Sequence, residues 1–183
     1  MIQKTLQFIY DKATGRNILI LFLLSIVNML IFLAGYQYAT GQLNNGIEFI
    51  ALDNPLSSVE EVYQRIKTYN AAARQTHVWL TLTADFTFPI IYSLLFSLTI
   101  VFYTKKTLSK YLIISVIPFL GAFFDYLEAI GIVGLLINYN QQMSGFATFF
   151  LIVKFLKFVF FYISIFIILG LFITWIIKKS KNK

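Results

Sequence analysis

Four long runs of apolar residues divide the chain, and polar or charged connections separate them. Crossing a hydrocarbon core of about 30 Å takes roughly 20 helical residues, and each run reaches that length. Residues 1–13 mix apolar and polar side chains in a way that favours a short amphipathic helix on the inner membrane surface. The pattern predicts an all-α integral membrane protein, a bundle of four transmembrane helices near residues 17–38, 78–103, 111–137 and 146–177.

The connection between the first two spans, residues 39–77, is long and contains the start signal of a further helix. Ser57 and Ser58 each stand three residues before a glutamate, which is the capping-box pattern of a helix N-terminus. We therefore predict an extracellular amphipathic helix over about residues 58–73. Such a helix could be a solvated cap or a lid over an outward-facing cavity, and the sequence leaves both interpretations open.

Composition supports a single membrane domain over residues 1–183 and excludes several classes of protein. Of these residues 58% are hydrophobic and 13% are charged, whereas charged residues make up about a quarter of a soluble domain. The chain has no cysteine and one histidine, His77, which excludes cysteine sites and all-histidine sites for a metal. No metal-binding spacing is present either, so we predict no metal and no cofactor.

The net charge of +7 reflects basic residues that gather at the chain ends and in the connection between the second and third apolar runs. Because they lie beside apolar runs, they indicate membrane orientation, and we expect no nucleic-acid partner. The positive-inside rule predicts a multi-pass protein of the cell (inner) membrane with both termini in the cytoplasm. The orienting residues are Lys4, Lys12, Arg16, Lys105, Lys106, Lys110, Lys178, Lys179, Lys181 and Lys183.

Five ionisable side chains lie inside the apolar runs: Asp85, Asp125, Glu128, Lys154 and Lys157. A charge at bilayer depth costs a few kcal/mol or more, so such residues are functional candidates by default. Counting helical residues outward from the cytoplasmic lysines places all five in the outer leaflet. We predict that they form one network around a water-filled vestibule that opens to the outside.

Helical spacing adds neighbours to this network. Asp125 and Glu128 share one face of the third span, because they are three residues apart. On the second span, Phe88 and Tyr92 follow Asp85 and could supply rings for cation–π contact with a cationic ligand. These residues, together with the two lysines, are our candidate binding site.

Each candidate also has a structural explanation. The long stems of Lys154 and Lys157 could let their amines snorkel to the outer headgroups. Asp125 and Glu128 could form a salt bridge that only stabilises the bundle. His77 stands at the predicted membrane edge, where a surface or interface group is expected rather than a proton-transfer group.

Three classes of function could use the cluster. The leading hypothesis is a non-catalytic protein that binds membrane lipids, a lipophilic or cationic amphiphile, a partner protein or a second copy of itself. The alternative is a membrane-embedded lipid-modifying enzyme, with Asp125 and Glu128 as an acid–base pair and His77 as a third catalytic candidate. A small transporter or a bacteriocin-immunity-type protein is the third class.

Three motifs carry a resemblance to a known family. They are the Glu-Glu-x-Tyr stretch that begins at Glu60, the Asp-x-x-Phe-Pro-x-x-Tyr stretch that begins at Asp85, and the Asp-x-x-Glu pair at Asp125 and Glu128. Together they resemble a family of small bacterial four-span membrane proteins that is uncharacterised. Ala129 stands where we expect asparagine in that family. The architecture is also similar to that of the emopamil-binding and sigma-2 receptor superfamily, which implies a cationic, sterol-like ligand.

Overall fold

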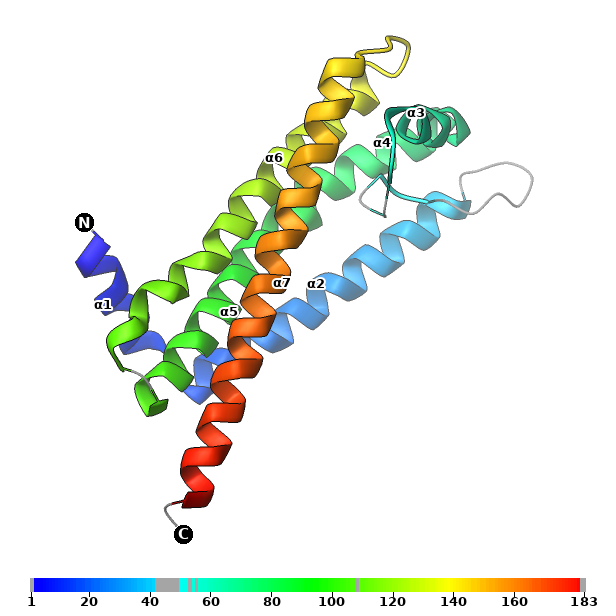
Figure 1. The fold of residues 1–183 in the computed structure, drawn as a ribbon. Coiled ribbons are helices and arrows are strands. Elements are labelled where there is room, and N and C mark those ends of the chain that lie inside the picture. Colours follow the sequence, from blue (N-terminus) through cyan, green and yellow to red (C-terminus); the bar gives the residue numbers. More distant parts are fainter. Residues whose placement is uncertain (1, 42–49, 53, 55, 108, 182–183) are drawn as a thin grey trace.

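The structure, a computed structural model, describes residues 2–41, 50–52, 54, 56–107 and 109–181. Within these ranges every regular element is a helix, and no strand forms (Figure 1). Part of the predicted outer connection, residues 42–49, lies outside the described residues, as do Lys183 and the side chains of Lys4 and Lys110. Four helical stretches are long and apolar enough to cross a membrane, namely Gly15–Gly41, Ala71–Thr107, Leu112–Ile137 and Ser144–Lys181.

The first helix, α1 (Ile2–Lys12), is short and precedes α2 (Gly15–Gly41). Ile9 and Ala13 are buried against Leu98 and Val101 in the C-terminal half of α5 (Phe86–Thr107). The amine of Lys105 donates hydrogen bonds to the carbonyl oxygens of Tyr10 and Ala13. This contact fixes α1 against the end of the bundle that carries the C-terminus (Figure 1).

The helix between the first two spans, α3 (Val59–Thr68), begins at the predicted capping box. The Ser58 hydroxyl accepts a hydrogen bond from the Glu61 amide at 3.2 Å. The Glu61 carboxylate accepts hydrogen bonds from the Ser57 amide at 2.9 Å and from the Ser57 hydroxyl at 2.8 Å. The helix start is therefore confirmed, with the reciprocal bond reaching one residue further back than in the standard box.

The end of this helix differs from the prediction over residues 58–73. The α3 helix stops at Thr68, and the Asn70 side chain accepts a hydrogen bond from the Ala73 amide at 2.8 Å. An asparagine in this position caps a new helix and satisfies an amide that would otherwise have no partner at the helix start. The second span consequently begins at residue 71, earlier than the predicted residue 78.

The second span consists of α4 (Ala71–Leu80), one π-helical turn η2 (Thr81–Asp85) and α5. The widened turn lies just before Pro89, which lacks a backbone N–H group and cannot donate the hydrogen bond that a regular α-helix requires at that position. The Asn28 side chain, buried on α2, donates to the carbonyl oxygen of Ala84 at 3.1 Å. This bond joins the first span to the irregular turn.

The third span is η3 (Ser109–Val116) followed by α6 (Ile117–Ile137), and the fourth is α7 (Ser144–Lys181). The α6 and α7 helices pack closely because α6 has glycine at the contact. A Cβ atom added at Gly131 would lie 2.9 Å from the Phe150 ring. Small residues at such contacts let two membrane helices approach closely.

The α3 helix covers the end of the bundle opposite the C-terminus (Figure 1). Its buried residues Val62 and Ile66 belong to one hydrophobic cluster with Ile132 and Leu135 of α6 and Phe150 of α7. One face of α3 is thus packed on the bundle. We call α3 and the residues 50–52 and 54 before it the cap.

We expect acidification to loosen the first turn of α3. The hydrogen bonds from Ser57 hold the pKa of Glu61 below its ordinary value of 4.5. Because the pKa is lowered in the folded state, the ionised Glu61 carboxylate stabilises the helix start above pH 4.5. This stabilisation is lost as the pH falls through the lower pKa of the folded state. Amide hydrogen exchange of α3, corrected for intrinsic rates, should show this loss. Glu61→Gln should remove the pH dependence; an unchanged dependence in that variant would contradict the assignment.

Candidate functional site

Lys157 of α7 lies between the two carboxylates of α6. Its Nζ is 2.8 Å from Asp125 Oδ1 and 2.5 Å from Glu128 Oε2. Asp125 is 2% exposed and Glu128 is 1% exposed, so both carboxylates are removed from solvent. A buried charge needs a close partner of opposite sign, and one ammonium group supplies it to both acids.

Lys154, one turn before Lys157 on α7, connects the same pair of helices to the cap. Its Nζ lies 3.8 Å from Glu128 Oε1. The same amine donates hydrogen bonds to the carbonyl oxygens of Leu52 at 2.5 Å and Asn54 at 2.6 Å. Lys154 therefore joins α6, α7 and the segment that precedes α3.

The second span contributes Asp85 and Tyr92. Asp85 lies within electrostatic range of Lys157, which brings the third predicted acid to the network. The Tyr92 hydroxyl approaches α6 at Gly121, where an added Cβ would be 3.3 Å away. The ring of Tyr92 contacts Phe88, with centroids 5.3 Å apart. Both aromatic residues are thus engaged in packing beside the charges.

His77 lies on α4 and is 2% exposed. Of the expected surface or interface position, the surface part is therefore wrong: the ring is buried and contacts Tyr69, the residue that follows α3, at a centroid distance of 5.9 Å. It precedes Asp85 by eight residues on a continuous helix, or about 12 Å along the axis. This axial separation concerns Asp85 alone, the acid on the same span as His77.

The network of five charges is present, but its surroundings differ from the prediction. Neither lysine snorkels, because both amines point inward to the partners described above. Asp125 and Glu128 are almost completely covered, so the expected vestibule is not open to a ligand at these carboxylates. We call the four paired residues Asp125, Glu128, Lys154 and Lys157 the charge latch.

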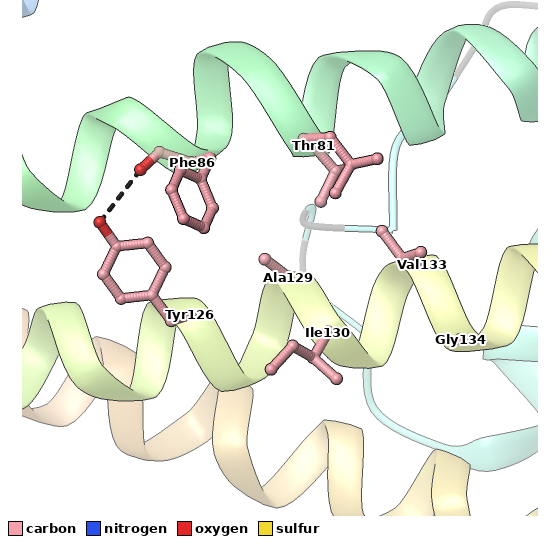
Figure 2. Close-up of a pocket in the computed structure, with 8 residues that line it drawn as sticks. Thr81, Phe86, Tyr126, Ala129, Ile130, Val133 and Gly134 are labelled. Carbon is pink, nitrogen blue, oxygen red and sulfur yellow. Dashed lines mark hydrogen bonds between the residues drawn. The ribbon is translucent and has the colours of Figure 1, made fainter.

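A groove on another face of α6 was missed by the sequence analysis. It has a volume of about 460 Å³ and lies between the second span and α6 (Figure 2). The Tyr126 hydroxyl donates to the Phe86 carbonyl oxygen at 3.1 Å and closes one end. The lining is almost entirely hydrocarbon. It consists of Thr81, Leu82, Phe86, Tyr126, Ala129, Ile130, Val133 and Gly134.

The groove opens sideways from the bundle. Leu82, Phe86 and Ile130 are each more than half exposed, although they lie on helices apolar enough to span a membrane. A sequence signal exists in retrospect, because the small side chain of Ala129 stands among larger ones in the part of α6 that lines the groove. Helical spacing alone does not show that the facing helix leaves this space unfilled.

No family model, curated protein or solved structure matches this chain. The interpretation of the latch and the groove therefore rests on their own geometry.

Proposed function

We propose that the protein is a multi-pass membrane protein that binds a membrane lipid, without catalysis, in the groove between the second span and α6. The observation that carries this proposal is a hydrocarbon-lined groove that opens at apolar, exposed side chains. Its volume of about 460 Å³ is within the range of small-molecule sites, which hold their ligands mainly by apolar contact. An acyl chain matches this lining.

The proposed orientation places both termini in the cytoplasm and the cap outside the cell membrane. Supporting this, the basic residues at the ends of α5 and α7 lie together, since Lys178 donates to the Thr107 carbonyl oxygen at 2.5 Å. The cap is at the opposite end of the bundle (Figure 1). By the positive-inside rule, the groove then belongs to the outer leaflet.

Burial of the charge latch supports binding rather than acid–base catalysis. A catalytic acid or base must reach the proton that it transfers, directly or through one water molecule. Asp125 and Glu128 instead face Lys157 inside the protein. In this proposal the latch holds α6 and α7 together and so fixes one wall of the groove.

Filling the groove tests the proposal. Val133→Trp should reduce the phospholipid that copurifies with the protein in mild detergent, measured by native mass spectrometry. Displacing two methylene groups from the groove costs about 1.6 kcal/mol, which corresponds to about a tenfold loss of retention.

The matched control is Val27→Trp, which adds the same bulk to an exposed position on α2 that is not part of the groove. It should retain lipid as the parent does. Equal retention by Val133→Trp and Val27→Trp would overturn the proposal.

A further inference from the structure

The outer end of the groove carries a positively charged side chain. Arg74 lies on α4, seven residues before Thr81 of the groove wall, so it stands two turns further out on the same helix face, about 10 Å away. Its guanidinium carbon is 3.7 Å from the centroid of the Tyr139 ring. Tyr139 follows the end of α6, the other wall. The Arg74 and Tyr139 contact therefore joins the two walls above the groove.

This guanidinium group is held in place but is not saturated. One nitrogen donates to the Tyr69 carbonyl oxygen at 2.6 Å, and the Tyr139 ring covers one face. A guanidinium group has five N–H donors in a rigid plane, which suits bidentate bonding to a phosphate. Over the described part of the chain, no carboxylate forms an ion pair with Arg74. Its charge is therefore available for an anionic group.

We propose that Arg74 binds the phosphate of a phospholipid whose acyl chain occupies the groove. This inference rests on the proposed function and adds the chemical class of the ligand. A phospholipid carries its groups in the same order as this surface, with an anionic phosphate at the membrane boundary and hydrocarbon below it. The exposed Trp79 on α4 lies between these two levels, as an interfacial aromatic residue does.

Three other cations near this end of the bundle, Lys157, Lys154 and Arg65, are engaged with partners of their own. Lys157 is paired with both carboxylates of the charge latch, and Lys154 is bonded to the cap. Arg65 on α3 pairs with Glu61 and donates to the Ala51 carbonyl oxygen. Arg74, which is partly exposed and has no ion-pair partner among the described residues, adjoins the apolar groove between the second span and α6.

The test compares two lipids with identical acyl chains on the full-length protein. Phosphatidylglycerol carries the phosphate, and diacylglycerol lacks it. We expect the parent to retain phosphatidylglycerol at least about tenfold better than diacylglycerol in native mass spectrometry. A tenfold difference corresponds to about 1.4 kcal/mol, which is less than a hydrogen bond to a charged group contributes. Arg74→Gln should lower phosphatidylglycerol retention to the diacylglycerol level and leave diacylglycerol retention unchanged.

Lys67→Gln is the control for net charge, since Lys67 is an exposed cation on α3 and should have no effect. Unchanged phosphatidylglycerol retention in Arg74→Gln would overturn this inference while leaving the groove proposal intact. An equal loss of both lipids would also overturn it, because Arg74 would then shape the groove rather than bind phosphate. If Val133→Trp retains both lipids fully, the proposed function itself fails.

Discussion

Lys157→Met is expected to lower the free energy of unfolding by about 3–5 kcal/mol, the usual cost of removing one partner from a buried ion pair. Methionine keeps most of the lysine stem but removes the ammonium group between Asp125 and Glu128. The two carboxylates would then lie buried on one face of α6 without their shared partner. Lys154 would remain near Glu128, at 3.8 Å. Unfolding in mixed detergent, followed by circular dichroism, measures the loss.

Neutralising the acids separates lost charge pairing from lost packing. The triple variant Lys157→Met, Asp125→Asn, Glu128→Gln should regain most of the stability, because replacing a whole buried ion network by neutral groups is often close to neutral. Lys179→Met, at an exposed lysine near the end of α7, is the control and should change little. Equal small losses in Lys157→Met and Lys179→Met would show that the buried pairing is not a stabilising contact.

Much of this architecture follows from the sequence, because polar backbone groups and charged side chains inside a membrane need partners within the protein. An apolar run of sufficient length must be helical in a bilayer, since every backbone group needs an internal partner. The start of α3 was predictable for a local reason, because Ser58 and Glu61 satisfy amides within one turn. The charge latch was predictable in outline because Glu128 and Lys157, placed at similar depth on different helices, are costly unless they meet.

The remaining features depend on how segments approach one another. No periodicity indicates that Lys154 reaches the carbonyl oxygens of Leu52 and Asn54, which lie a hundred residues or more away in sequence. The burial of His77 involves Tyr69, the residue that follows α3, and the helix of His77 itself gives no sign of that contact. The groove depends on the spacing of two helices around Ala129, which helical periodicity does not determine.

Lys154→Met is expected to open the cap while the bundle stays folded, at a cost of about 3 kcal/mol. The variant removes the donor to two carbonyl oxygens, Leu52 and Asn54, and a hydrogen bond to a charged group contributes a net stability of about 1.5–3 kcal/mol. Glu128 keeps its closer partner, Lys157, at 2.5 Å. Hydrogen exchange should therefore lose protection at Leu52 and at the start of α3, with α6 unchanged.

A double variant distinguishes the two roles of this lysine. If Lys154 acts through the carbonyl oxygens, Lys154→Met with Glu128→Gln should leave the cap as exposed as the single variant does, because neutralising the acid restores no donor. This is the opposite of the rescue expected for Lys157. Restored protection of the cap in the double variant would instead mean that Lys154 holds the cap by balancing the charge of Glu128. The charge latch thus divides into a lysine that joins α6 to α7 and a lysine that attaches the cap.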